Sequence, residues 1–95
     1  LLVFGGSQGA KRINDLFTES LMPHLSGVQI IHFTGSKESE KVLSKQYLAS
    51  GISSYVRSFE NRMDLAWAAA DMAVTRAGAS SIAEQREFGV PGILI

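Results

Sequence analysis

The sequence predicts an α/β fold with a Rossmann-like parallel sheet and flanking helices. Short apolar runs alternate with amphipathic stretches along the 95 residues, as they do in chains built from βαβ units. The first apolar run, Leu1–Phe4, passes directly into a glycine-rich loop, and a helical pattern of apolar residues follows that loop. In α/β proteins, a strand, a glycine loop and a helix in this order bring backbone N–H groups close to a phosphate.

Each expected strand is a short apolar run bounded by polar, glycine or proline residues. These runs predict strands over residues 1–4, 28–33, 54–59, 72–75 and 92–95. Helices are expected between them, over stretches that include residues 13–21, 36–50, 63–70 and 80–88. Ser36 has the residue type of an N-cap for the second helix, and Gly51 has that of its C-terminal stop.

The helical apolar spacing also predicts which side chains face the core. The expected inward-facing residues are Ile13, Leu16, Phe17 and Leu21 in the first helix and Val42, Leu43 and Tyr47 in the second. The third helix carries Leu65, Ala66 and Trp67. Of the two histidines, His24 is expected to be exposed. His32 alternates within a strand, and we expect a half-buried, hydrogen-bonded role for it rather than a catalytic one.

Composition limits the class of protein. Hydrophobic residues make up 45% and charged residues 19%, which suits one globular domain at most. Nine basic residues balance nine acidic ones, so no basic excess points to nucleic acid, and the absence of cysteine excludes disulfides. Because the chain starts and stops within predicted strands and lacks an initial Met, we expect it to be a piece of a longer protein.

Three loops follow the ends of predicted strands, where open parallel sheets bind their ligands. Residues 5–9 and 76–81 offer glycines and hydroxyl groups at helix starts, which suit phosphate oxygens. Residues 59–63 offer an aromatic ring and a Met, which suit the flat face of a base. Glu84 lies one turn into the helix after the last loop, where a carboxylate can accept two hydrogen bonds from a ribose diol. Together these loops predict a site for a nucleoside diphosphate.

Each of these features also has a purely structural interpretation, which the residues alone leave open. The G-G-x-x-G loop has neither the dinucleotide spelling nor the P-loop ending, so its glycines can simply make a turn and allow close packing. Ser81 and Glu84 have the spacing of a capping box. Taken singly, Phe59 is more typical of a core residue and Met63 of a gap filler.

A longer combination of motifs resembles one family. Gly5-Gly6-Ser7-Gln8-Gly9-Ala10 is followed, in order, by Arg76-Ala77-Gly78-Ala79, Glu84 and Gly89-Val90-Pro91. This combination is similar to the bacterial MurG family, which transfers N-acetylglucosamine from UDP-N-acetylglucosamine to lipid-linked N-acetylmuramyl-pentapeptide. The resemblance covers essentially the whole chain. It identifies residues 1–95 as part of the C-terminal, UDP-GlcNAc-binding domain of a GT-B glycosyltransferase, truncated at both ends and without the N-terminal acceptor domain.

The resemblance implies a role for each matching position. Ser7 would contact the nucleotide phosphates within a loop formed with Gly5, Gly6 and Gly9, and this loop would also face the acceptor pyrophosphate. Phe59 would cap the uracil, Glu60 would read the edge of the base through its backbone, and Met63 would line the same pocket. The residues that would present a helix N-terminus to the diphosphate are Gly78, Ala79, Ser80 and Ser81.

The same resemblance assigns Glu84 to the ribose hydroxyls and Arg76 to support of its loop. Family members often carry an apolar residue at the position of Glu60, which is a mild departure because the implied contact is made by the backbone. No metal and no cofactor are implied, since helix ends and backbone N–H groups would neutralise the diphosphate.

The implied reaction is the inverting conversion of lipid I to lipid II in peptidoglycan synthesis, at the cytoplasmic face of the bacterial membrane. The implied partners are UDP-GlcNAc and an undecaprenyl-linked acceptor lipid, with no nucleic acid. The general base and the peripheral membrane contact would belong to regions outside this chain. We therefore expect no catalytic residue within residues 1–95, and we expect the isolated chain to be inactive.

Other functions compatible with this pattern remain. One is a different GT-B enzyme acting on UDP-sugars, such as a glycolipid synthase or a UDP-GlcNAc 2-epimerase. Another is a non-catalytic nucleotide-sugar-binding half that needs a membrane-anchored partner. A third is a Rossmann-like binding module for another nucleotide.

Overall fold

The computed structural model describes residues 1–5, 13–21, 23, 27–75 and 85–94. All paired strands run parallel and form one sheet in the order β3-β2-β1-β4-β5. The strands are β1 (Leu2–Phe4), β2 (Ile30–Phe33), β3 (Ser54–Arg57), β4 (Ala73–Thr75) and β5 (Gly92–Leu94). The predicted parallel α/β sheet is confirmed, and its Rossmann-like strand order follows from the pairing.

The strand order changes direction beside β1. The chain steps outward from β1 through β2 to β3, and it then returns to place β4 on the other side of β1. Phe4 at the end of β1 is in register with Phe33 of β2 and with Thr75 of β4. Because all strands are parallel, their carboxyl ends lie along one edge of the sheet. The topological switch point therefore lies at this edge, between β1 and β4.

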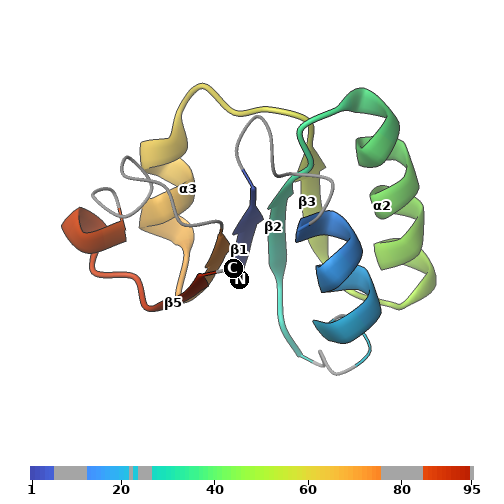
Figure 1. Ribbon diagram of the computed structural model, residues 1–95, viewed down its shortest axis with the longest axis horizontal. Coiled ribbons are helices and arrows are strands. Elements are labelled where there is room, and N and C mark those ends of the chain that lie inside the picture. The colour runs from blue at the N-terminus through green and yellow to red at the C-terminus, as the bar shows by residue number, and fades with distance from the viewer. Residues whose placement is uncertain (6–12, 22, 24–26, 76–84, 95) are drawn as a thin grey trace.

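Helices cover both faces of the sheet (Figure 1). Residues 13–16 are helical and continue into the π-helix η1 (Phe17–Leu21). This helical segment and α2 (Lys37–Ala49) pack on one face, and α3 (Met63–Ala69) packs on the other. The segment 85–88 is also helical. The result is a three-layer arrangement in which alternate strand residues face opposite cores.

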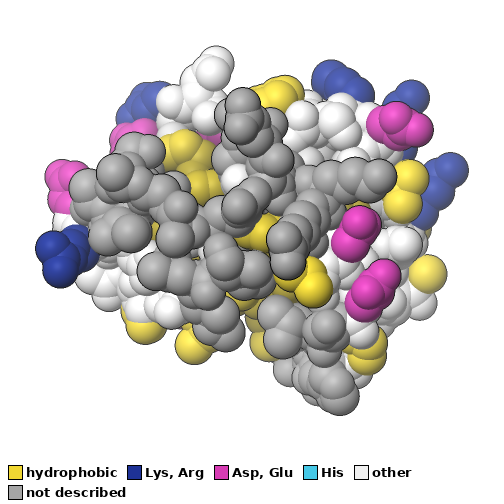
Figure 2. All heavy atoms as spheres, in the orientation of Figure 1, with side chains coloured by type: hydrophobic (Ala, Val, Ile, Leu, Met, Phe, Trp, Pro, Cys, Tyr) yellow, Lys and Arg dark blue, Asp and Glu magenta, His cyan; other side chains and the backbone are white. Residues whose placement is uncertain are grey.

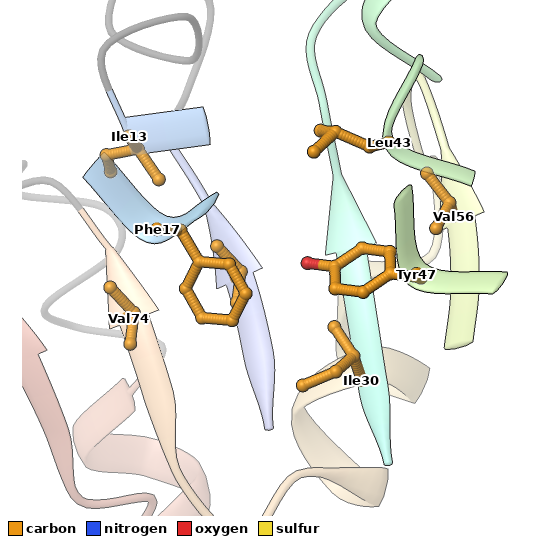
Figure 3. Packing of buried hydrophobic residues seen from close by; sticks show 8 residues of the cluster. Ile13, Phe17, Ile30, Leu43, Tyr47, Val56 and Val74 are labelled. Atoms are coloured by element: carbon orange, nitrogen blue, oxygen red, sulfur yellow. The ribbon is translucent and has the colours of Figure 1, made fainter. Parts of the chain in front are cut away.

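The first core lies between the sheet and the two helical segments on its first face. Ile13 and Phe17 come from segment 13–21, and Leu43 and Tyr47 come from α2 (Figure 3). All four side chains are buried, as the helical spacing predicts. The rings of Phe17 and Tyr47 approach edge to face with 6.3 Å between centroids, so they join the two helices above the sheet.

The second core centres on Trp67 of α3. The indole is almost fully buried, and the Phe4 ring meets it at 5.6 Å in a nearly perpendicular arrangement. Leu2, Ala73 and Val90 complete this cluster. The contact places the part of α3 around Trp67 over the carboxyl end of β1.

Three expectations are wrong in detail. The helical spacing predicts an inward-facing Val42, but this side chain is 52% exposed, because Leu43 and Tyr47, one turn apart, fill the narrow stripe of α2 that meets the sheet. The apolar run predicts a third strand that reaches Phe59, but the strand ends at Arg57, where the paired strand β2 also ends. The second strand begins at Ile30 rather than at Val28.

The predicted ends of α2 are confirmed. The Ser36 hydroxyl accepts a hydrogen bond from the Ser39 N–H at 3.1 Å, as an N-cap does. Gly51 follows the helix with a φ of 72°, a left-handed conformation that glycine adopts without steric cost. In helical segment 13–21, the spacing predicts that Leu16 faces inward, but its side chain is only half-buried.

Candidate functional site

The structure describes some of the predicted site residues, and the others lie outside the described part of the chain. The structure describes Gly5, Phe59, Glu60 and Met63. The remaining predicted residues lie outside the described residues, and they are Gly6, Ser7, Gly9, Gly78, Ala79, Ser80, Ser81 and Glu84. Arg76 and His24 also lie outside. The geometry of the site is therefore built from the strand ends that lead into the two glycine-containing loops and from the Phe59 loop.

Gly5 and Thr75 mark the switch point. Gly5 directly follows β1 and is half-buried, and Thr75 is the last residue of the neighbouring strand β4. The two loops that carry glycines therefore leave adjacent parallel strands at the same edge. This is the position at which open α/β sheets bind their ligands.

Thr75 is a polar residue of this edge that the sequence patterns did not single out. Its side chain is buried, and within the described part of the chain its hydroxyl oxygen has no hydrogen-bond partner. A buried hydroxyl is normally hydrogen-bonded. Because Thr75 ends β4 at the switch point, its hydroxyl adds a polar group to this edge of the sheet. It follows the apolar residues Ala73 and Val74 at the end of a strand, which is a position that an ordinary core threonine also occupies, so the sequence gives no signal that distinguishes it.

Phe59 lies at the same end of the sheet. It follows β3 in the segment that crosses from β3 toward α3 along the carboxyl edge (Figure 1). Its side chain is 67% exposed, so the interpretation of Phe59 as a core residue is wrong. An exposed aromatic ring at a ligand-binding edge presents a flat apolar face on which a base can stack.

Hydrogen bonds anchor the chain on both sides of Phe59. The Ser58 N–H donates to Glu40 Oε1 of α2 at 2.9 Å, and the Gly35 N–H donates to the Ser58 carbonyl oxygen at 2.9 Å. On the other side, the Arg62 N–H donates to Glu60 Oε1 at 2.8 Å. These bonds hold the backbone of the loop while the Phe59 ring remains exposed.

Glu60 turns its carboxylate back onto its own loop. This hydrogen bond gives the side chain a structural role that the sequence did not indicate, and the predicted contact between the Glu60 backbone and a base stays a prediction. Arg62 and Asp64 form an exposed ion pair at 2.9 Å beside the start of α3. The hydrogen bond from Arg62 lowers the pKa of Asp64, but both groups are well solvated, so the pair contributes little stability.

Met63 begins α3 and is half-buried. It packs against the cluster that contains Trp67 and Phe33. The gap-filling interpretation accounts for the buried part of the Met63 side chain. The exposed part of the side chain lies four residues from Phe59, at the end of the loop that joins β3 to α3. Both interpretations of Met63 are compatible with this position.

A buried polar network next to this edge was not found from the sequence. His32 Nε2 lies 2.6 Å from Asn14 Oδ1, and His32 Nδ1 lies 2.6 Å from the Tyr47 hydroxyl. Asn14 Nδ2 donates to the Thr34 carbonyl oxygen at 3.0 Å. The expected hydrogen-bonded role of His32 is confirmed, but the residue is fully buried rather than half-buried.

Burial explains how the network titrates. Desolvation lowers the pKa of His32 to about 4, so the imidazole is neutral at neutral pH. Desolvation also raises the pKa of the Tyr47 phenol above its ordinary value. Only the alternation of His32 within a strand and the polar Asn14 one residue after an inward-facing Ile13 hint at this network in the sequence.

The charged side chains visible on the face in Figure 2 include both signs. Acidic and basic side chains lie near one another around the rim of the face in Figure 2. Among the described residues, no group of three or more His, Cys, Asp or Glu side chains is placed to hold a metal ion. No helix in the described part of the chain is long and apolar enough to cross a membrane.

A hollow of about 600 Å³ lies at the opposite, amino edge of the sheet. It is lined by residues directly before β2, by residues from the end of α3 to the start of β4, and by Leu1 and Ile31. None of the four described site residues contributes to its lining. It is therefore separate from the edge that carries Gly5, Thr75 and Phe59.

Comparisons with known proteins agree with this geometry. The family described as glycosyltransferase family 28 C-terminal domain matches residues 1–95. The chain is 48% identical over 101 residues to the UDP-N-acetylglucosamine--N-acetylmuramyl-(pentapeptide) pyrophosphoryl-undecaprenol N-acetylglucosamine transferase of Protochlamydia amoebophila (strain UWE25). It is 42% identical over 98 residues to the protein of the same name from Streptomyces coelicolor. Both alignments cover 100% of this chain and 26% of the relative.

A solved structure has the same fold. The crystal structure of Acinetobacter baumannii MurG matches with a TM-score of 0.83 and 27% sequence identity, over 99% of this chain and 27% of that one. The chain thus spans about a quarter of the length of the relatives that it matches. Since the family match extends over all 95 residues, this chain belongs to the glycosyltransferase family 28 C-terminal domain family.

Proposed function

We propose that this chain is the donor-binding part of an inverting hexosyltransferase. The complete enzyme would transfer N-acetylglucosamine from UDP-GlcNAc to lipid-linked N-acetylmuramyl-pentapeptide, converting lipid I to lipid II. The observation that carries this proposal is the 42% to 48% identity, over the whole chain, with transferases of that name. The exposed Phe59 ring and the switch point at the same sheet edge support a nucleotide site in this part of the enzyme.

The proposed donor site has three parts. Phe59 stacks on the uracil, the Glu60 backbone meets the edge of the base, and Met63 lines the same pocket. The Glu84 carboxylate accepts hydrogen bonds from the ribose. The diphosphate lies between the two glycine-containing loops, which contribute Gly5, Gly6, Ser7 and Gly9 on one side and Gly78, Ala79, Ser80 and Ser81 on the other.

The chemistry follows from charge development on the leaving group. The acceptor hydroxyl oxygen attacks the anomeric carbon while the bond between that carbon and the β-phosphate oxygen breaks. The electron pair leaves with UDP, and the hydroxyl proton passes to a general base in the acceptor domain. Backbone N–H groups directed at the β-phosphate stabilise this charge, and removal of one such donor costs about 3 kcal/mol of barrier.

The remaining assignments complete the proposal. Residues 1–95 are part of the C-terminal domain of a two-domain GT-B protein, and the acceptor domain supplies the lipid site. The enzyme works at the cytoplasmic face of the bacterial membrane, to which it binds peripherally. Support comes from the relatives, of which this chain covers 26%.

The experiment compares Phe59→Ala with Leu48→Ala in the intact protein that carries this chain. Leu48 is a matched control because it is an apolar side chain that is 82% exposed near the end of α2, away from the site. Lipid II formation is measured from labelled lipid I at increasing UDP-GlcNAc. Loss of base stacking, worth about 1–3 kcal/mol, should raise KM for the donor about tenfold in Phe59→Ala and leave Leu48→Ala unchanged. Absence of lipid II formation by the unaltered protein would refute the proposed reaction.

A further inference from the structure

The buried network described above joins three elements through side chains. Asn14 comes from the helical segment that follows the glycine-rich loop, His32 from β2 and Tyr47 from α2. Asn14 is 5% exposed, and His32 and Tyr47 are fully buried. Polar side chains with this burial are costly unless every hydrogen-bonding group is paired.

The contacts permit one consistent arrangement of protons. Asn14 Nδ2 donates to the Thr34 carbonyl oxygen, so the acceptor Oδ1 is the atom that faces His32 Nε2. His32 must then carry its proton on Nε2 and accept through Nδ1, to which the Tyr47 hydroxyl donates. This assignment satisfies both imidazole nitrogens in the neutral form, in agreement with the lowered pKa of His32.

Thr34 extends the network to the Phe59 loop. Its N–H donates to the Arg57 carbonyl oxygen at 2.9 Å, and the next N–H, that of Gly35, donates to the Ser58 carbonyl oxygen at 2.9 Å. Phe59 follows directly. A continuous set of hydrogen bonds therefore runs from Asn14, across the carboxyl end of β2, to the residue before Phe59.

We infer that Asn14 is a positioning residue, which fixes helical segment 13–21 relative to Phe59 through the carboxyl end of β2. The inference rests on the proposed function, because that function takes the glycine-rich loop before this segment as the diphosphate contact and Phe59 as the base contact. Asn14 is suited to this role because its amide both donates to the Thr34 carbonyl and accepts from His32. Its donor and its acceptor are separate atoms of one rigid amide group, so both bonds can form at once, whereas the carboxylate of an Asp would offer acceptors only.

The network has two ends, which provides a matched control. Asn14→Ala removes the connection on the side of the glycine-rich loop. Tyr47→Phe removes only the hydroxyl at the opposite end, where Tyr47 attaches α2 to His32. Each variant leaves His32 with one unpaired nitrogen, so both are expected to lower stability, but only Asn14→Ala removes the bonds that hold segment 13–21 to the carboxyl end of β2. Asn14→Asp serves as a second variant, since it keeps an acceptor for His32 and loses the donor toward Thr34.

The test measures UDP affinity and amide hydrogen exchange in the intact protein that carries this chain. We expect Asn14→Ala and Asn14→Asp to weaken UDP binding about tenfold, a change similar in size to the contribution of one buried hydrogen bond. We also expect both variants to speed amide hydrogen exchange in residues 13–17. Tyr47→Phe should change UDP affinity less than twofold and leave exchange in residues 13–17 unaltered.

The two readouts separate the inference from the proposed function. If the unaltered protein does not bind UDP, the proposed function fails, and exchange in residues 13–17 still decides whether Asn14 fixes this segment. Unchanged exchange in both Asn14 variants would overturn the positioning role. Equal losses of UDP affinity in Asn14→Ala and Tyr47→Phe would also overturn it, because the effect would then follow stability rather than loop position.

Discussion

The imidazole Nε2 of His32 lies 2.6 Å from the side-chain oxygen of Asn14, although the two residues are 18 positions apart in the sequence. This contact joins a strand in the middle of the sheet to the helical segment that follows the glycine-rich loop. It also places a titratable group in a fully buried position. The same hydrogen bond therefore contributes to the stability of the fold and holds the start of segment 13–21 against the middle of the sheet.

Burial of His32 makes stability depend on pH. Its pKa is about 4 in the folded chain against an ordinary value of 6.5, so between these values the unfolded state binds more protons. The contribution of neutral His32 to the free energy of unfolding is fully present above pH 6.5. It is lost as the pH falls toward 4, by a total of about 3 kcal/mol. Urea unfolding at intervals from pH 7.5 to 4 measures this loss.

The control for this prediction is His32→Gln, which cannot titrate. The carboxylates and the other histidine contribute equally to both proteins, so the difference between the two pH profiles isolates His32. A difference that stays constant from pH 7.5 to 4 would show that the His32 pKa is not lowered in the folded state.

Truncation of Trp67 should strongly destabilise the fold. Its indole is almost fully buried on the second face and meets the Phe4 ring edge to face. Trp67→Ala should therefore lower the free energy of unfolding by about 3–5 kcal/mol. Leu65→Ala, two residues away in the same helix, removes an exposed side chain and should change it by less than about 0.5 kcal/mol. Similar effects of the two substitutions in urea unfolding would contradict the packing of α3 described here.

Glu40 should influence nucleotide binding without touching the nucleotide. Its carboxylate accepts the Ser58 N–H, which fixes the backbone directly before Phe59. Glu40→Ala should weaken UDP binding by a factor of about 5–10, corresponding to about 1–1.4 kcal/mol, which is within the range for one intramolecular hydrogen bond. Glu38→Ala is the matched control, because Glu38 shares the first turn of α2 and is exposed. Equal UDP affinity in the two variants, measured by calorimetry, would show that the Glu40 bond does not position the loop.

Local patterns in the sequence predicted the elements better than they predicted their arrangement. The spacing of Leu43 and Tyr47 located the buried stripe of α2, and Ser36 located its start, because both depend on residues within a few turns. Val42 was misplaced because the width of the buried stripe depends on how much of the sheet the helix covers. The return of the chain from β3 to β4, which creates the switch point, depends on pairing between distant strands.

In the candidate site, too, local patterns located single residues but not their contacts with distant parts of the chain. Phe59 could be recognised as a residue after a strand, but only the end of β3 at Arg57 explains why its ring is exposed. The partners of His32 lie 15 and 18 residues away, on two different helical segments, and no local pattern connects them. The roles predicted for Ser7 and Glu84 lie outside the described residues and stay predictions.

The central claim is that this chain binds a uridine diphosphate at the carboxyl edge of its sheet. The most direct test is an NMR titration of the isotope-labelled chain with UDP-GlcNAc, with UDP and ADP as controls. The account predicts shifts clustered in residues 5–9, 59–63 and 78–84, with UDP matching UDP-GlcNAc and ADP without effect. A dispersed spectrum that none of the three ligands alters, or shifts confined to the amino edge of the sheet, would contradict it.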